Sequence, residues 1–161
     1  MKFRLVTAFA AAMLLAACSS SEDVATTDSA GSSSDSSGAG AVSPGSIEDF
    51  QVNVGDRVYF DYDSYEIRAD AQDTLQKQAA WLQQYPNYTV IVEGHCDERG
   101  TREYNLALGE RRANAVKNYM IALGIDGNRV QTISYGKERP ESAESTETAW
   151  ALNRRGVTVP Q

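Results

Sequence analysis

The residues most capable of chemistry lie between Gly94 and Arg112, in the stretch G-H-C-D-E-R-G-T-R-E-Y-N-L-A-L-G-E-R-R. This stretch holds the only histidine of the chain, one of its two cysteines and a dense set of charged side chains. His95, Asp97 and Glu98 are residue types that serve as general acids and bases or as metal ligands. A β-branched run leads into the stretch, so we expect these side chains on a loop that directly follows a strand.

A metal site or a hydrolytic site needs more than this stretch provides. A structural zinc site takes four Cys or His ligands, whereas the chain after Cys18 holds one His and one Cys, adjacent in sequence. Neither a Gly-x-Ser-x-Gly nor a His-Glu-x-x-His pattern occurs. We therefore expect no metal, no cofactor and no enzymatic activity.

Two further carboxylates, Asp61 and Asp63 in F-D-Y-D, admit several interpretations. A glycosidase uses two acids that can lie far apart in the sequence, so these residues could belong to such a pair. They could also belong to a calcium loop. More simply, both are residues that form turns at the end of a strand.

Arg112 lies on the apolar stripe of a helix predicted over residues 101–123, where steps of three or four residues join it to Leu108 and Val116. A guanidinium on an inward face needs an acceptor, because an unpaired buried charge costs several kcal/mol. Asp97, in the loop before this helix, is the nearest candidate in sequence. The two side chains can pair with each other, or together hold a ligand that carries one charge of each sign. Periodicity leaves both alternatives open.

The elements that must position these groups follow from apolar periodicity and from glycine and proline stops. Strands are predicted at 58–62, 89–92, 130–135 and 156–159, and helices at 67–82, 101–123 and 148–152. This order predicts an α/β (α+β) fold, a two-layer sandwich whose small mixed sheet of about four strands carries two main helices on one face. Right-handed crossovers between parallel neighbours are expected. The last strand is expected to be short and to stop at Pro160.

The N-terminus has the pattern of an exported lipoprotein. Lys2 and Arg4 precede an apolar run that is too short for a membrane-spanning helix, so residues 1–17 are interpreted as a signal peptide. The sequence L-A-A-C ending at Cys18 resembles the lipobox of bacterial lipoproteins, in which the cysteine is acylated; the alternative is an ordinary signal peptide cut nearby. Ser19 after this cysteine favours the outer membrane over retention in the inner membrane.

Composition divides the remaining chain into a tether and a domain. Residues 18–45 are rich in Ser, Gly, Ala and Asp and are predicted to form a flexible tether, whereas residues 46–161 suffice for one folded domain. The net charge of −7 and the lack of a basic patch speak against nucleic acid as a partner. Cys96 has no partner if Cys18 is acylated, so it is interpreted as a small buried residue.

Several separated blocks resemble the OmpA-like domain family. They are the stretch from Gly94 onward, F-D-Y-D-S-Y-E-I before it, and S-Y-G-K-E-R-P and N-R-R after it. The resemblance covers about residues 57–159, and the lipobox and tether match lipid-anchored members. It implies a non-enzymatic domain that binds peptidoglycan non-covalently, through the diaminopimelate of the stem peptide. Cys96 and Gly156 depart from the family's pattern. Gly156 stands where a residue with a side chain is commoner in the family, so the last strand is expected to be weak.

The resemblance also implies roles for single residues. Asp97 matches the family's aspartate that receives the ligand's ammonium, and Arg112 the arginine that receives its carboxylate. Asn105 and Leu108 match the N-x-x-L at the start of the helix. The remaining expected ligand contacts are His95, Phe60 and Asp61.

The implied partners are peptidoglycan, the outer membrane through the lipid on Cys18, a TolB-like periplasmic β-propeller protein, and other wall-linked outer-membrane proteins such as OmpA-like ones. The implied role is support of outer-membrane integrity and of constriction at cell division. Two other classes of function stay open. One is a protein-binding periplasmic adaptor, in which Asp97 and Arg112 only brace the loop. The other is a wall hydrolase with an anchoring motif.

Overall fold

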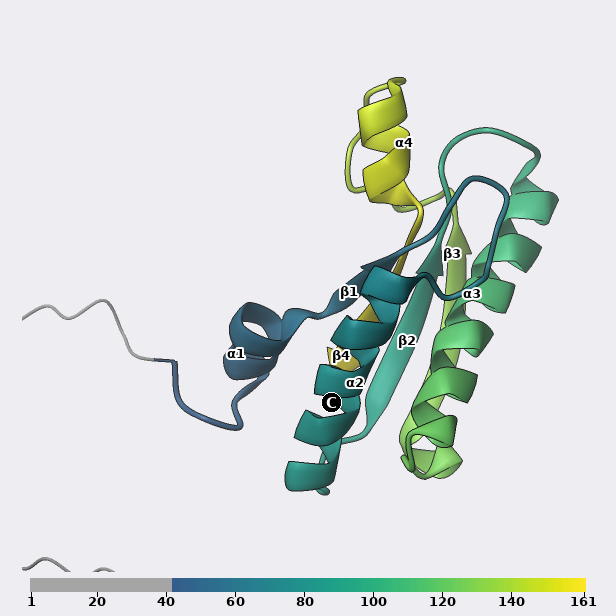
Figure 1. Cartoon of the computed structure of the whole chain (residues 1–161). Helices are drawn as coiled ribbons and strands as arrows, with labels where there is room; N and C mark the ends of the chain where they lie inside the picture. The colour runs from purple at the N-terminus through teal and green to yellow at the C-terminus, as the bar shows by residue number, and fades with distance from the viewer. Residues whose placement is uncertain (1–41) are drawn as a thin grey trace, which may run out of the picture. The chain divides into compact units, whose positions relative to one another are not determined.

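The computed structural model describes residues 42–161, in which a four-stranded sheet carries two long helices (Figure 1). The predicted signal peptide, Cys18 and nearly all of the predicted tether lie outside the described residues. The strands are β1 (Arg57–Tyr59), β2 (Val90–His95), β3 (Val130–Gly136) and β4 (Arg155–Pro160). The helices are α1 (Ile47–Asp49), α2 (Ala69–Gln84), α3 (Arg102–Ala122) and α4 (Glu147–Asn153), with a π-helical segment η1 (Phe50–Gly55) and a 3-10 turn η2 (Gly127–Arg129).

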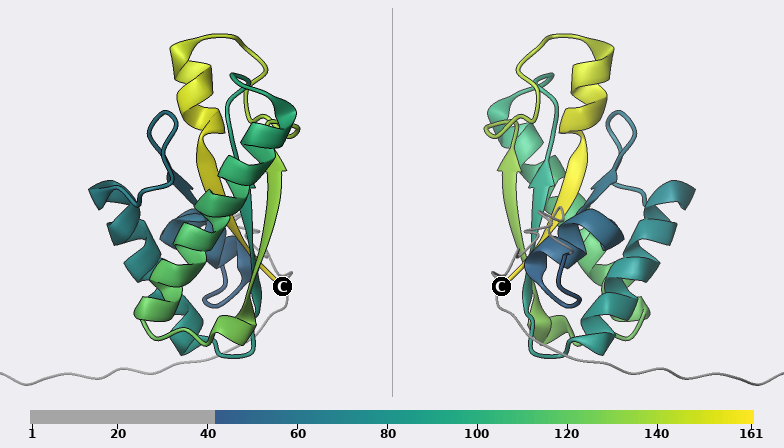
Figure 2. Two further views of the ribbon diagram at one scale, coloured as in Figure 1. Left: turned by 90° about the vertical axis from the view of Figure 1, so that its right-hand side faces the viewer. Right: turned by 90° about the vertical axis from the view of Figure 1, so that its left-hand side faces the viewer.

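The predicted two-layer arrangement is confirmed. Helices α2 and α3 lie on one face of the sheet, and the strands form the opposite layer (Figure 2). The strand order is β1-β4-β2-β3, with β2 and β3 parallel and the other neighbours antiparallel, so the sheet is mixed as predicted. Both helices turn one apolar stripe toward the sheet, and this stripe joins the single core. Within residues 42–161, no helix is long and apolar enough to cross a bilayer.

The prediction of parallel neighbours is wrong for β1 and β2, because β4 lies between them and runs antiparallel to both. The expectation that the last strand is weak is also wrong, since β4 is an inner strand paired along both edges. The physical reason lies at Gly156. A Cβ there would stand 3.3 Å from the side chain of Val116 and 3.4 Å from that of Phe60, so the glycine lets β4 pass close beneath other core side chains. Such packing is invisible to strand propensity.

The segment around β1 also differs from prediction. The strand was predicted over residues 58–62, but it ends at Tyr59, and Tyr62 is 62% exposed. Helix α1 and η1 were not predicted. Phe50 in η1 is fully buried against Trp81, and the indole N–H of Trp81 donates to Asp49 at 3.0 Å, so tertiary contacts with α2 hold this short segment.

Helix α3 starts and ends as predicted, and it crosses β2 at close range. Thr101 caps the helix, its hydroxyl oxygen accepting from the N–H of Tyr104 at 3.2 Å. Gly124, with φ of 95°, follows the last turn. A Cβ on Gly94 of β2 would overlap the carbonyl oxygen of Gly109 in α3, so only glycine allows the two backbones to approach this closely. This crossing places the start of α3 beside the end of β2.

Candidate ligand-binding site

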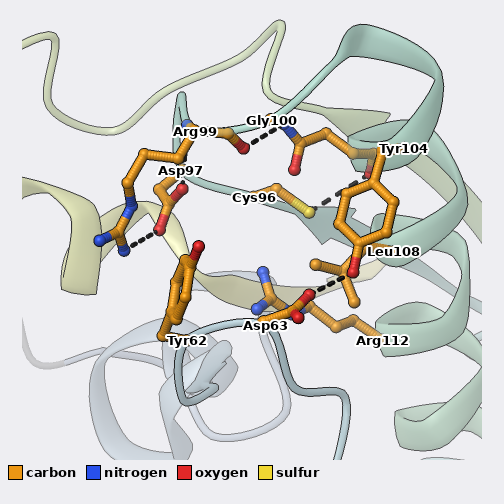
Figure 3. A pocket seen from close by; sticks show the side chains of 10 residues that line it. Tyr62, Asp63, Cys96, Asp97, Arg99, Gly100, Tyr104, Leu108 and Arg112 are labelled. Atoms are coloured by element: carbon orange, nitrogen blue, oxygen red, sulfur yellow. Dashed lines mark hydrogen bonds and ion pairs between the residues drawn. The ribbon is translucent and has the colours of Figure 1, made fainter.

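A cavity of about 110 Å³ opens where three segments meet at the end of the sheet that is uppermost in Figure 1. The segments are the loop after β1, the loop after β2 and the first turns of α3. Ten residues line the cavity: Tyr62, Asp63, Cys96, Asp97, Arg99, Gly100, Tyr104, Asn105, Leu108 and Arg112. Figure 3 shows Asp97 and Arg99 on one side of this space and Tyr104, Leu108 and Arg112 on the other.

Arg112 brings to the cavity a positive charge that forms no ion pair among the described residues. The residue is 1% exposed, and its guanidinium donates to the carbonyl oxygens of Ser64 at 2.8 Å, His95 at 2.8 Å and Asp61 at 3.1 Å. Within residues 42–161, no carboxylate oxygen lies within 4 Å of it. Burial lowers the pKa of this guanidinium, which shows how unfavourable its surroundings are to charge. Arginine nevertheless keeps its proton in proteins.

Asp97 is the buried carboxylate of the site. It is 4% exposed and accepts from the backbone N–H of Arg99 at 3.1 Å and from its guanidinium at 2.6 Å. The guanidinium of Arg154 lies 3.4 Å from the same carboxylate. Burial raises the pKa of Asp97, but the hydrogen bonds and charge of Arg99 outweigh this effect and hold the pKa below its usual value. Asp97 is therefore ionised at neutral pH.

The guanidinium of Arg99 is stacked between two aromatic rings. Its Cζ lies 4.1 Å from the ring centre of Tyr62 and 4.1 Å from that of Trp150. A second nitrogen lies 3.5 Å from Glu147. Such stacking fixes a cation while leaving part of it in contact with solvent, and the side chain is 29% exposed. Helix α4 does not line the cavity, but through Trp150 and Glu147 it supports Arg99, which does.

The floor of the cavity ties the loop after β2 to α3. The thiol of Cys96 donates to the carbonyl oxygen of Asn105 at 3.3 Å, and the amide of Asn105 donates to that of Arg99 at 2.8 Å. Cys96 is 3% exposed, and burial raises the pKa of its thiol to about 11. The interpretation of Cys96 as a small buried residue is confirmed.

Four of the predicted contact residues come together here, namely Asp97, Arg112, Asn105 and Leu108. The other three do not line the cavity. Phe60 is buried beneath Arg112, with the guanidinium 5.2 Å from its ring centre. Asp61 offers only its backbone to Arg112, because its carboxylate pairs with Arg68 at 3.1 Å. His95 is buried with its ring 5.5 Å from that of Tyr135.

The sequence did not single out Tyr62, Asp63, Arg99, Gly100 or Tyr104 as contacts. In F-D-Y-D the second aromatic–acidic pair, not the first, reaches the cavity, because the chain turns after β1 and Asp63 adopts a positive φ of 53°. The hydroxyl of Tyr104 donates to Asp63 and closes this side of the rim. Two adjacent aromatic–acidic pairs were the only available signal, and they did not distinguish the two registers.

Among residues 42–161, no three His, Cys, Asp or Glu side chains are grouped so that they could hold a metal ion. The cavity offers one buried cation that forms no ion pair within residues 42–161, one buried carboxylate and polar backbone groups. This arrangement suits a small ligand that bears both charges.

The OmpA family matches residues 59–154, which include every residue that lines the cavity. The chain belongs to the OmpA family. It is 62% identical over 122 residues to the peptidoglycan-associated lipoprotein of Brucella melitensis biotype 1, an alignment that covers 76% of this chain and 73% of that protein. It is equally identical, over 122 residues, to the protein of the same name from Rhizobium meliloti, covering 76% of this chain and 69% of that protein.

A solved structure supports the same assignment. The crystal structure of the peptidoglycan-associated lipoprotein from Burkholderia pseudomallei matches with a TM-score of 0.68 and 38% sequence identity. The match covers 72% of this chain and all of that one. The resemblance seen in the sequence motifs is thereby confirmed, and the names of these relatives denote no enzymatic activity.

Acid pH is expected to destabilise this domain through His95. Burial and the charge of Arg155 lower the pKa of the imidazole from 6.5 to about 4. Between these values the unfolded chain binds a proton that the folded chain does not, so the free energy of unfolding falls as the pH drops. The loss due to His95 is roughly 3 kcal/mol between about pH 7 and pH 4. Urea unfolding of the parent and of His95→Gln at both pH values measures it, and equal losses in the two proteins would contradict the assignment.

Proposed function

We propose that the chain binds peptidoglycan non-covalently, through the diaminopimelate residue of the stem peptide. The observation that carries this proposal is the buried guanidinium of Arg112, which lines a cavity and, among residues 42–161, donates hydrogen bonds to carbonyl oxygens alone. A ligand carboxylate would supply the missing negative charge and form strong, charge-assisted hydrogen bonds. The name of the relatives supports peptidoglycan as the source of that ligand.

Asp97 provides the second half of the proposed recognition. The end of a diaminopimelate side chain carries an ammonium and a carboxylate on one carbon atom. Asp97 would accept from the ammonium while Arg112 donates to the carboxylate, and both line the same small cavity. Each charge-assisted bond contributes roughly 1.5–3 kcal/mol net. Asn105 and Leu108 would contact the ligand from α3.

In the cell, this binding would tether the outer membrane to the wall. The membrane anchor is the lipid proposed for Cys18, and the domain would face the periplasm. Single contacts would be weak, but many tethered copies facing one polymer would gain effective concentration and hold firmly as a layer. We further propose that the protein acts in a Tol-Pal system with a TolB-like partner, which supports outer-membrane integrity and constriction at division.

Discrimination between two kinds of wall tests the proposal. A lysine stem carries the ammonium but lacks the carboxylate, so Arg112 would stay buried without its counter-charge. We expect the purified full-length protein to bind diaminopimelate-type fragments about 10- to 100-fold more tightly than lysine-type fragments. Competition by soluble fragments in co-sedimentation with purified wall measures the ratio. Equal affinity for both would sink the proposed role of Arg112, and no binding to either would favour the protein-binding adaptor.

A further inference from the structure

Arg154 connects the parts of the site but does not line the cavity. It lies between α4 and β4 and is 8% exposed. Its Nε donates to the carbonyl oxygen of Phe60 at 3.2 Å, while the N–H of Phe60 donates back to the carbonyl oxygen of Arg154 at 2.8 Å. Its Nη1 lies 3.4 Å from Asp97 and 3.0 Å from Glu147. One side chain therefore reaches the end of β1, the loop after β2 and α4.

The two guanidiniums beside Asp97 differ in what else holds them. Arg99 lines the cavity, is partly exposed and stacks on aromatic rings. The guanidinium of Arg154 is buried and donates to the carbonyl oxygen of Phe60, and a second bond from the N–H of Phe60 ties the backbone of Arg154 to the same residue. A contact that is buried and tied to a strand end holds its partner more rigidly than an exposed one, because fewer alternative rotamers are available. Arg154 is thus the fixed neighbour of Asp97.

We infer that Arg154 is a positioning residue for ligand binding, which locks the carboxylate of Asp97 at a set place relative to the loop after β1. This inference rests on the proposed function. Phe60 immediately precedes the loop whose carbonyl oxygens at Asp61 and Ser64 are held by Arg112. Arg154 therefore sets the separation between the half of the site that takes an ammonium and the half that takes a carboxylate. A zwitterionic ligand with both charges on one carbon tolerates little error in that separation.

Replacement by Gln and by Lys separates position from charge. Arg154→Gln is expected to lower the affinity for diaminopimelate-type wall about tenfold. It also removes a cation beside Asp97, which makes this carboxylate easier to protonate. In a curve of wall binding against pH, the acid limb is the part at low pH where binding is lost because Asp97 becomes protonated, and this limb should move to higher pH. Arg154→Lys keeps a cation near Asp97 but lacks the Nε–H that donates to the carbonyl oxygen of Phe60. This variant should hold the acid limb at its parent position while recovering only part of the affinity.

The measurement is co-sedimentation of the full-length protein with purified diaminopimelate-type wall, at a series of pH values from acid to neutral. Circular dichroism at each pH checks the fold. Arg102→Gln is the matched control, since Arg102 pairs with Glu138 at 3.1 Å on the surface and is 73% exposed. The control should bind like the parent.

The outcomes separate this inference from the function on which it rests. Failure of the parent protein to bind wall would remove the proposed function itself. If the parent binds wall and folded Arg154→Gln shows the same affinity or the same acid limb, the role of Arg154 is overturned. If Arg154→Gln does not fold, Arg154→Lys carries the test, because it keeps a cation at this position. Folded Arg154→Lys that binds wall as tightly as the parent would overturn the inference.

Discussion

Replacing Asp97 by Asn or Arg112 by Gln is expected to weaken binding to diaminopimelate-type wall by about 10- to 100-fold. Each change removes one proposed charge-assisted contact to the ligand. Asn keeps the shape of Asp97, and Gln keeps a polar, shorter side chain at position 112. For Arg112, the loss of affinity should exceed the contribution of one ligand contact. Its guanidinium also holds the carbonyl oxygens of Asp61 and Ser64, in the loop that forms one wall of the cavity. Co-sedimentation of the full-length variants with purified wall measures both effects.

Matched controls make this result specific to the site. Arg111→Gln changes the neighbouring arginine of α3, which is exposed and lies 5.9 Å over the ring of Tyr65. Asp73→Asn changes an exposed carboxylate of α2. Both should bind like the parent, because neither side chain lines the cavity. Wall binding that survives in folded Asp97→Asn and Arg112→Gln would move the site elsewhere.

Gly94→Ala is expected to destabilise the domain by about 3 kcal/mol or more, enough to leave a large part of it unfolded if its stability is ordinary. The added methyl would overlap the backbone carbonyl of Gly109. No change of rotamer can relieve a clash with backbone, so β2 and α3 would have to separate. Because the loop after β2 and the start of α3 line the cavity, the folded remainder should also lose affinity for wall. Urea unfolding monitored by circular dichroism measures the stability.

Gly156→Ala in β4 is the graded comparison. Its Cβ would meet side-chain atoms of Val116 and Phe60 at 3.3 and 3.4 Å, and these can shift by a few tenths of an ångström. The expected loss is about 1 kcal/mol. Equal stability of Gly94→Ala and the parent would show that the close crossing of β2 and α3 does not hold the fold.

The positions of the two central residues of the site, Arg112 and Asp97, could be predicted from the sequence. The inward position of Arg112 followed from helical periodicity, and the loop position of Asp97 followed from the β-branched run and the N-cap that enclose it. Both are local signals, since side chains three or four apart share a face and a capping residue acts within one turn. The structure adds that Arg112 and Asp97 do not pair with each other among the described contacts, because Arg112 donates to backbone carbonyl oxygens and Asp97 is held by Arg99.

Two features could be identified only in the folded chain: which residues of the loop after β1 reach the cavity, and which residues distant in sequence contact the site. The sequence chose Phe60 and Asp61 as contacts, whereas the turn after β1 brings Tyr62 and Asp63 to the cavity. It gave no sign that Arg154, 57 residues away, would lie beside Asp97.

By itself, then, the sequence determined the fold class, the order of the main strands and helices from β1 to β4, and the two charged residues that meet at the cavity, because periodicity, caps and contiguous motifs act over a few residues. Only the tertiary structure decided that β4 lies between β1 and β2, that Gly94 and Gly109 set how closely α3 approaches the sheet, and that α4 supports Arg99 at the cavity. These features arise from packing between segments distant along the chain. Such packing depends on shape and close approach, which no local pattern of residue types records.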